Sequence, residues 1–222
     1  MSDQEAAKKA AGESAAAVVE DGMKVGLGTG STVRYAIEAL GATGYALSCV
    51  ATSTATEELA GRVGLRLVAP DEALHLDVTI DGADEVDAGL NLTKGGGGAL
   101  TREKVVAAMA DRFVVVVDRS KVVPLLGPFG IPVEVLPFAP AVAAEALMAL
   151  GARSIDRRED LSDNGGVLLD ADFGEIGDPA ALAASLSAVP GVIDHGIFLA
   201  DLVSTVVVAD ADGTIEVLGD PL

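Results

Sequence analysis

The segment KGGGGALTREKVVAAMADRFVVVVD, residues 94–118, contains three elements in succession. Four consecutive glycines come first, a pattern that predicts a helix over residues 99–110 follows, and the valine-rich run 113–118 predicts a buried strand. A similar alternation of strands and helices runs through the residues before this segment. Alternation of this kind predicts a parallel sheet with helices on both faces.

The other elements of the first half are expected at regular intervals. The expected strands span residues 23–27, 46–51, 66–68 and 76–81, and the expected helices span residues 4–19, 32–40, 54–61 and 70–74. In open parallel sheets, ligands bind outside the carboxyl ends of the strands. We therefore expect functional residues in the loops that follow the strands and in the glycine run.

Three prolines, Pro124, Pro128 and Pro132, separate this half from a different pattern. The expected elements are then a strand at 133–136, a helix at 141–150, strands at 152–156 and 166–172, a helix at 179–188 and a strand at 191–194. This order predicts a small ferredoxin-like α+β unit. Two runs on either side of Asp212-Gly213, residues 205–209 and 214–217, predict a hairpin that rejoins the first sheet.

The composition excludes several classes of protein. The chain has 222 residues, a formal net charge of −19 and one cysteine, Cys49. An acidic chain without a basic stripe is not expected to bind nucleic acid, and a single cysteine excludes an internal disulfide. Apolar runs shorter than about 18 residues exclude a helical membrane span, and the N-terminal residues lack the apolar core of a signal peptide. We expect a cytoplasmic protein, whose acidity also fits a salt-rich cytosol.

The glycine run is expected to bind an anion. Glycines let several backbone N–H groups point at one spot, and the following helix adds its positive end. Lys94 adds the fixed cation that a developing enolate oxygen requires. Glu103 lies one turn into the helix on an apolar face, where burial raises the pKa of a carboxyl group and favours a general base. The alternative is a first-turn acid that only stabilises the helix dipole.

The motif GLGTGST, residues 26–32, follows the first expected strand and opens a helix. Its glycines, its hydroxyls on Thr29, Ser31 and Thr32, and the helix start suit the binding of a phosphate group. It matches neither a Walker loop nor a dinucleotide-binding loop. The alternative is a plain turn in which Ser31 or Thr32 caps the helix.

The motif DGADE, residues 81–85, ends a strand with three acids. The functional interpretation is that Asp81 and Asp84 face polyol hydroxyls. A solvated turn is the second interpretation. A divalent metal site is the least favoured, because no histidine is nearby and Lys94 competes for the negative charge. The other chemically versatile side chains are expected to be structural or on the surface, and they are His75, His195 and Cys49.

GLGTGST, DGADE and KGGGGALTREK, in this order and at these separations, resemble segments of type A ribose-5-phosphate isomerases, and the resemblance spans nearly the whole chain. Segments DRSK at 118–121, PVEVLP at 132–137, DNG at 163–165 and PGV at 190–192 are similar as well. The resemblance implies a Rossmann-like α/β domain with a parallel sheet in three layers, over residues 1–127 plus 200–222. It also implies a smaller ferredoxin-like α+β domain over residues 128–199.

The resemblance further implies a reaction and an assembly. The reaction is the interconversion of D-ribose 5-phosphate and D-ribulose 5-phosphate through a cis-enediol, without a metal or other cofactor, in the non-oxidative pentose phosphate pathway. The partner is a small-molecule sugar phosphate, with no nucleic acid and no membrane. The assembly is a homodimer or homotetramer.

Particular residues receive roles from the same resemblance. Glu103 matches the general base that moves a proton between C1 and C2, and Lys94 matches the lysine that stabilises the enediolate. Asp81 and Asp84 match acids that bind the sugar and help to open its ring or shuttle hydroxyl protons. The matching substrate-binding positions are Thr29, Gly30, Ser31, Thr32, Asp81, Gly82, Ala83, Asp84, Lys94, Gly95, Gly96, Gly97 and Lys121. The loop ATSTAT, residues 51–56, departs from the serine-rich loop of many relatives.

Two competing functions are weaker. A sugar-phosphate sensor of the kind found in regulators needs a DNA-binding module, and no basic helix-turn-helix is evident in this sequence. A different enzyme on a related fold, such as an amino-sugar-phosphate isomerase or a CoA transferase, is the other alternative. An amino-sugar enzyme is expected to use a histidine in ring opening, and neither histidine is placed for that step.

Overall fold

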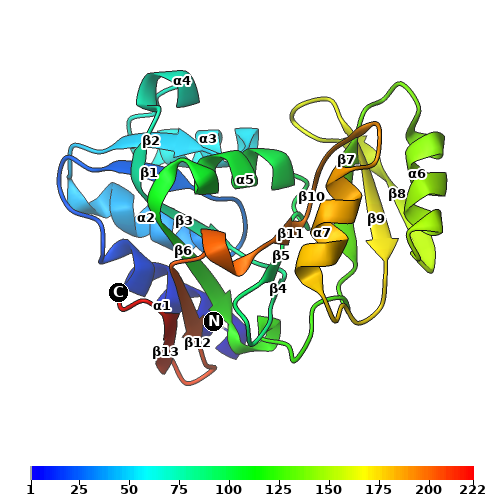
Figure 1. Ribbon diagram of the computed structural model, residues 1–222. Coiled ribbons are helices and arrows are strands. Elements are labelled where there is room, and N and C mark those ends of the chain that lie inside the picture. Colours follow the sequence, from blue (N-terminus) through cyan, green and yellow to red (C-terminus); the bar gives the residue numbers. More distant parts are fainter. Residues whose placement is uncertain (1) are drawn as a thin grey trace. The chain divides into compact units, whose positions relative to one another are not determined.

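The computed structural model describes residues 2–222, and within these residues no helix is both long and apolar enough to cross a membrane. The chain folds into two compact units (Figure 1). The first unit comprises the chain up to Ala83, Arg102–Val122 and Asp201–Leu222. The second unit comprises Asp84–Thr101 and Val123–Ala200. Each unit has its own sheet and its own apolar core.

The first unit is built on a six-stranded sheet with the order β13-β12-β6-β3-β1-β2. Its strands are β1 (Lys24–Leu27), β2 (Ser48–Ala51), β3 (Leu76–Gly82), β6 (Ala110–Asp118), β12 (Thr205–Ala209) and β13 (Ile215–Gly219). The first five are parallel, and β13 pairs antiparallel with β12. The predicted parallel sheet and the predicted hairpin that rejoins it are both confirmed. The expected strand at 66–68 forms only one bridge, between Leu67 and Cys49, because the chain turns away at Pro70.

Helices cover both faces of this sheet, as the alternation predicted. The helices are α1 (Asp3–Ala16), α2 (Val33–Thr43), α3 (Thr54–Arg62), α4 (Pro70–Ala73) and α5 (Leu100–Ala108). Val78 and Ile80 of β3 belong to the apolar cluster that includes α1 and α2. Thr79 lies between them on the opposite face, because side chains alternate along a strand, and its hydroxyl donates to the carbonyl of Val106 in α5, 3.0 Å away.

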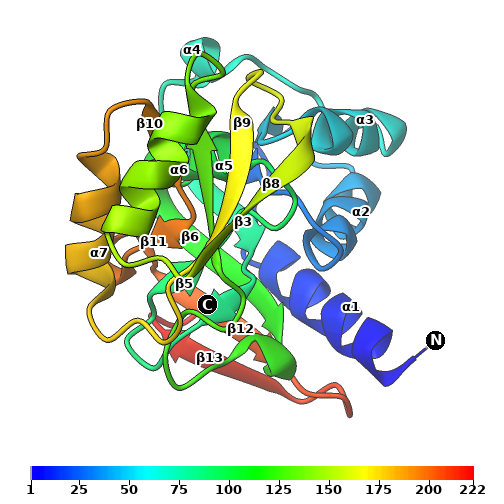
Figure 2. The ribbon, with the colours of Figure 1, turned by 90° about the vertical axis from the view of Figure 1, so that its right-hand side faces the viewer.

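The second unit has a four-stranded antiparallel sheet with the order β10-β7-β9-β8. Its elements are β7 (Ile131–Val135), α6 (Pro140–Ala149), β8 (Ser154–Leu161), β9 (Val167–Asp172), α7 (Pro179–Ser187) and β10 (Val192–His195). This is the predicted ferredoxin-like succession, which is confirmed. Leu147 of α6 and Leu186 of α7 pack with Leu169 of β9 in one core cluster, so both helices lie on one face of the sheet (Figure 2).

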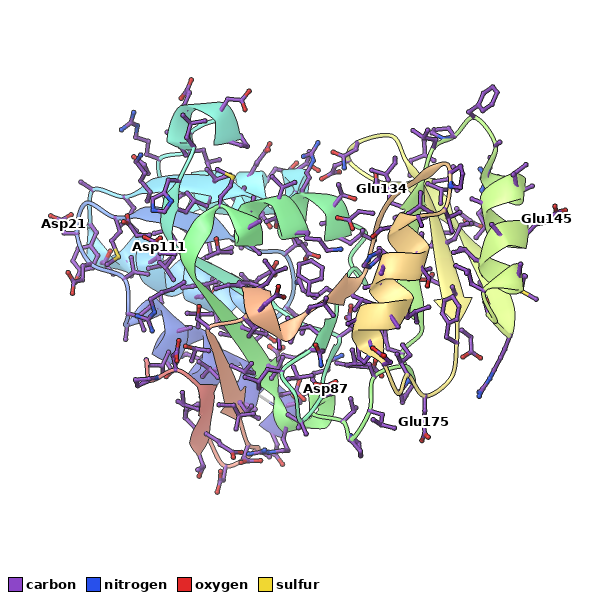
Figure 3. All side chains as sticks on the ribbon, viewed as in Figure 1. Asp21, Asp87, Asp111, Glu134, Glu145 and Glu175 are labelled. Carbon is purple, nitrogen blue, oxygen red and sulfur yellow. The ribbon has the colours of Figure 1, made fainter. Side chains whose placement is uncertain are left out.

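A second, three-stranded sheet with the order β11-β5-β4 was not expected. It consists of β4 (Glu85–Val86), β5 (Leu92–Thr93) and β11 (Ile197–Phe198). Strands of two residues are too short to show an alternating pattern in sequence. Asp87, labelled in Figure 3, closes the turn between β4 and β5, because its Oδ1 accepts from the backbone N–H groups of Gly89 and Asn91, each at 2.8 Å.

This small sheet changes the division of the chain. Residues 84–101 belong to the second unit, whereas the sequence placed them within a first domain of residues 1–127 plus 200–222. The reason is the pairing of β5 with β11, which joins this segment to residues 197–198. The glycine run is therefore part of the second unit, and the α5 helix that follows it begins there and continues in the first.

Candidate active site

The loop that follows β1 packs directly on Asp81 at the carboxyl end of β3. The side chain of Asp81 is fully buried, and its Oδ1 accepts from the backbone N–H groups of Thr29, at 3.1 Å, and Gly82, at 2.7 Å. The N–H of Gly28 donates to the carbonyl of Ile80 at 2.9 Å. The predicted loop and one of the two predicted carboxylates are thus brought together in the first unit.

A cluster of four hydroxyl groups holds the same loop from the β2 side. The Oγ1 of Thr29 lies 2.8 Å from Oγ1 of Thr52, 2.7 Å from Oγ of Ser53 and 3.0 Å from Oγ1 of Thr56. Thr56 in turn donates to the carbonyl of Gly28 at 2.9 Å. The hydroxyls of the ATSTAT segment therefore fix the conformation of the GLGTGST loop. Spacing in the sequence gave no signal for this contact.

The alternative interpretation of the GLGTGST motif was a plain turn in which Ser31 or Thr32 caps α2. Thr32 occupies the N-cap position but makes no side-chain capping bond within the described residues. Gly30 and Ser31 are exposed. The first-turn amides of α2 and the Ser31 hydroxyl lie at a helix start, which is an arrangement that suits an anion.

Glu103 lies in the first turn of α5 and is 4% exposed. Leu100 and Ala107, on the same helix face, are also buried. The prediction of a carboxylate on an apolar, buried face is confirmed, and the side chain does not point into bulk water. Burying a carboxylate is costly, whereas the helix dipole favours an acid in the first turn whether or not it is buried.

The second unit contains Lys94 and Asp84. Lys94 follows β5, is 2% exposed, and its Nζ lies 5.4 Å from the centroid of the Phe198 ring, which is within cation–π range. The half-buried Asp84 accepts from the N–H of Gly96 through Oδ2 at 2.8 Å. The predicted acid and the predicted glycine run therefore meet, and a buried ammonium group precedes the run.

The glycine run requires glycine for its backbone conformation. Gly95 has φ 101° and Gly98 has φ 80°, values that other residues rarely adopt. The N–H of Gly98 donates to the carbonyl of Gly95 at 2.9 Å, which closes a tight turn. Two residues that the sequence did not indicate support this turn. Arg158 of β8 donates to the carbonyls of Gly95 and Gly96, and Asp170 of β9 holds Arg158.

Two buried glutamates of the second unit are structural. Glu85 accepts from the hydroxyl of Thr93 and from the N–H groups of Gly127 and Phe129. Glu134 of β7, labelled in Figure 3, is fully buried. Its carboxylate accepts from the hydroxyls of Thr101 and Ser162 and lies 3.4 Å from the amide nitrogen of Asn164. It thereby joins three motifs, PVEVLP, DNG and KGGGGALT.

The remaining candidates lie as follows. Lys121 is half-buried in the short helix η1 (Arg119–Lys121), which follows the carboxyl end of β6. His75 is exposed, with its Nε2 2.9 Å from Oδ2 of Asp111. His195 is buried, with its Nε2 3.1 Å from Oγ of Ser187. The expectation that both histidines are structural or on the surface is confirmed.

The fold and these groups define a class of protein: an α/β enzyme with buried carboxylates, a buried ammonium group and glycine-rich loops at strand ends. The family model for ribose 5-phosphate isomerase A, also described as phosphoriboisomerase A, matches residues 48–213. The chain is 49% identical over 219 residues to the ribose-5-phosphate isomerase A of Thermomicrobium roseum, a match that covers 94% of this chain and 92% of the relative. The chain belongs to the ribose 5-phosphate isomerase A family.

Solved structures agree with this assignment. The ribose 5-phosphate isomerase A of Neisseria gonorrhoeae superposes with a TM-score of 0.93 at 34% identity, covering 99% of this chain and 98% of the other. A D-ribose-5-phosphate isomerase in complex with phospho-erythronic acid gives a TM-score of 0.91 at 37% identity, covering 96% and 97%. The sequence-based family resemblance and fold class are confirmed.

Proposed function

We propose that the chain interconverts D-ribose 5-phosphate and D-ribulose 5-phosphate through a cis-enediol, with Glu103 as the general base. The observation that carries the proposal is the burial of the Glu103 carboxylate in the first turn after the glycine run. A carboxylate held away from water suits the removal of a proton next to a carbonyl group. Membership of the isomerase A family supplies the substrate.

The reaction proceeds by two proton transfers to and from carbon. Glu103 takes the proton from C2 of the open-chain aldose, the electron pair of the broken C–H bond forms the C1–C2 double bond, and the carbonyl electrons move to O1. The ammonium group of Lys94 and the amides of the glycine run stabilise the charge on O1. A proton then passes from O2 to O1, and Glu103 returns its proton to C1. Asp81 and Asp84 assist ring opening and the transfer between the oxygens.

We assign the two sets of residues to one substrate because the chain links them closely. Asp81 and Asp84 are three positions apart, and α5, which carries Glu103, begins two residues after the glycine run ends at Gly98. The exposed Gly30 and Ser31, with the first amides of α2, suit the phosphate group. The list of proposed substrate-binding positions is completed by Thr29, Thr32, Gly82, Ala83, Gly95, Gly96, Gly97 and Lys121.

The test is a pair of isosteric substitutions. Glu103→Gln removes the base and is expected to lower kcat by about 10²–10⁴-fold, while the affinity for phospho-erythronic acid is retained. Glu57→Gln is the matched control, because Glu57 is also a first-turn acid but is exposed at the start of α3. Turnover of ribose 5-phosphate is followed in the presence of a chelator. Wild-type activity in Glu103→Gln excludes this base, and an inactive wild-type protein excludes the reaction.

The assembly and the cellular setting are part of the same proposal. We infer a homodimer or homotetramer, which is supported by large apolar side chains exposed in the second unit: Phe138 is 95% exposed and Val142 63%. Exposed apolar groups of this kind suit burial between copies. The net charge of −19 argues against a nucleic-acid partner, and membership of the isomerase A family supports a cytoplasmic enzyme of the pentose phosphate pathway. Sedimentation velocity measures the oligomeric state directly, and a monomer at micromolar concentration rules out the proposed homodimer or homotetramer.

A further inference from the structure

Arg158 donates hydrogen bonds both to a carboxylate and to the backbone of the glycine run. Its Nε and Nη2 donate to Oδ2 and Oδ1 of Asp170, at 2.8 Å and 2.6 Å. Its Nη1 donates to the carbonyls of Gly95, at 2.9 Å, and Gly96, at 3.1 Å. The rigid fork of a guanidinium group can serve both sets at once, whereas a lysine offers only a point charge. The side chain is 22% exposed, so these bonds are only partly accessible to water.

The peptide group between Gly95 and Gly96 is held from both ends. Its carbonyl faces Arg158, and its N–H donates to Oδ2 of Asp84 at 2.8 Å. A trans peptide is planar and points its carbonyl and its N–H to opposite sides. Two opposite charges therefore fix the rotation of this peptide. The glycine run has no side chains of its own with which to do so.

Arg158 is itself fixed to the sheet of the second unit. In the register of β8 and β9, Asp156 lies opposite Asp170 and Arg157 lies opposite Leu169. Leu169 belongs to the core under α6 and α7, so Arg158 and Asp170 extend from the other face of the sheet. The glycine run lies on that face too, because a Cβ on Gly98 would lie 3.1 Å from Cδ1 of Leu168.

We propose that Arg158 is a positioning residue for the isomerase reaction: it fixes the carbonyls of Gly95 and Gly96, so that the backbone of the glycine run holds one orientation toward the substrate. The inference rests on the proposed function. Arg158 acts through the backbone and does not touch the reacting atoms. The physical reason is that donors aimed at a developing charge are effective only when they are pre-oriented, and a shift of about 1 Å can lower the rate by about 10²-fold.

The activity test compares two adjacent arginines. Arg158→Gln is expected to lower kcat by about 10–100-fold with a smaller change in KM, because the orientation is needed most in the transition state. Arg158→Lys is expected to recover part of the loss, since it restores one donor and the charge. Arg157→Gln is the matched control, because Arg157 is the neighbouring residue and is exposed. It is expected to keep wild-type kcat and KM.

A second readout does not depend on turnover. Hydrogen exchange at the amides of residues 95–98 is expected to be faster in Arg158→Gln than in the wild type and Arg157→Gln, while exchange in α6 is unchanged. If Arg158→Gln folds poorly, Asp170→Asn is used, because it loosens Arg158 without removing it, and an intermediate loss of kcat is expected. Wild-type kcat and exchange in the Arg158 or Asp170 variant overturns the inference. Equal losses in both arginine variants also overturn it.

A failure of the proposed isomerase function can be distinguished from a failure of the inference about Arg158. A wild-type protein that does not isomerise ribose 5-phosphate excludes the reaction, whatever the Arg158 variants do. In that case the exchange experiment still decides whether Arg158 orders the glycine run. Faster exchange supports the positional role, and unchanged exchange excludes it.

Discussion

The carboxyl group of Asp81 occupies the space in which a side chain at position 28 would lie. A Cβ on Gly28 would be 2.1 Å from Cγ and from Oδ1 of Asp81. The glycine pattern of the GLGTGST loop is therefore explained at this position by a carboxylate that lies on another strand. The loop and the acid are parts of one packed arrangement, and neither can change size without moving the other.

The first prediction concerns this contact. Gly28→Ala is expected to displace Asp81 or the loop, and to destabilise the fold by about 1–3 kcal/mol, as overpacking in a close-packed interior does. Activity is expected to fall further than stability accounts for, because Asp81 is moved. Urea unfolding and steady-state kinetics measure the two effects. Gly61→Ala in α3 is the control, since nothing lies within 4 Å of its added Cβ, and it is expected to be neutral or slightly stabilising.

The second prediction concerns the buried carboxylate that joins Thr101, Ser162 and Asn164. Glu134→Gln replaces one acceptor oxygen by a donor, so that a buried hydroxyl loses its partner, at a cost of about 1–3 kcal/mol. Thr101 lies two residues before Glu103 in α5, so kcat is expected to fall as well. Glu145→Gln is the control, because Glu145 of α6 is exposed and points away from the unit in Figure 3. Equal unfolding free energies for the two variants contradict the prediction.

The sequence predicted the elements that depend on local pattern. The apolar residues of β3 and the apolar face around Glu103 are local signals, and these residues are buried. The burial of Thr79 and Asp81 between and after them was not indicated by the alternation. The KGGGGALTREK motif is also a local signal, because Gly95 and Gly98 adopt positive φ values that favour glycine.

The missed features depend on partners that are distant in the chain. Arg158 contacts Gly95 across 63 positions and lies beyond the strand expected at 152–156. Nothing in the composition of the charged segment 156–160 indicates that one of its side chains is half-buried. The pairing of β5 with β11 could not be predicted from the sequence either, because strands of two residues are too short to show an alternation of apolar and polar residues. The hydroxyl cluster around Thr29 joins two loops that the sequence keeps 23 positions apart.

The third prediction concerns the single cysteine. Burial raises the pKa of the Cys49 thiol to about 12, so at pH 8 the group is almost entirely protonated and unreactive, because the thiolate is the nucleophile. A thiol reagent such as DTNB is expected to react with the native protein at the rate of its unfolding, and rapidly and stoichiometrically in urea. A fast reaction of the native protein at pH 8 contradicts this burial.

The fourth prediction concerns Asp210, at the turn of the β12–β13 hairpin. Its hydrogen bonds with Arg119, at 2.9 Å and 3.0 Å, lower the pKa of the carboxyl group. A carboxyl whose pKa is lower in the folded state stabilises the fold above its unfolded value, near 3.9, and this stabilisation is lost as the pH falls through the folded value. The ion pair is exposed, so the effect is small and is weakened by salt.

Asp210→Asn tests this linkage. The variant is expected to melt at a slightly lower temperature than the wild type at pH 7 in dilute buffer, and the difference is expected to disappear as the pH is lowered below the folded pKa of Asp210. Asp220→Asn is a control from the same end of the chain, because Asp220 is also an exposed aspartate. Since Arg119 also pairs with Glu216, part of the hairpin anchoring persists in the variant. A difference in melting temperature that stays constant from pH 7 to pH 2 rules out the Arg119 contact as its cause.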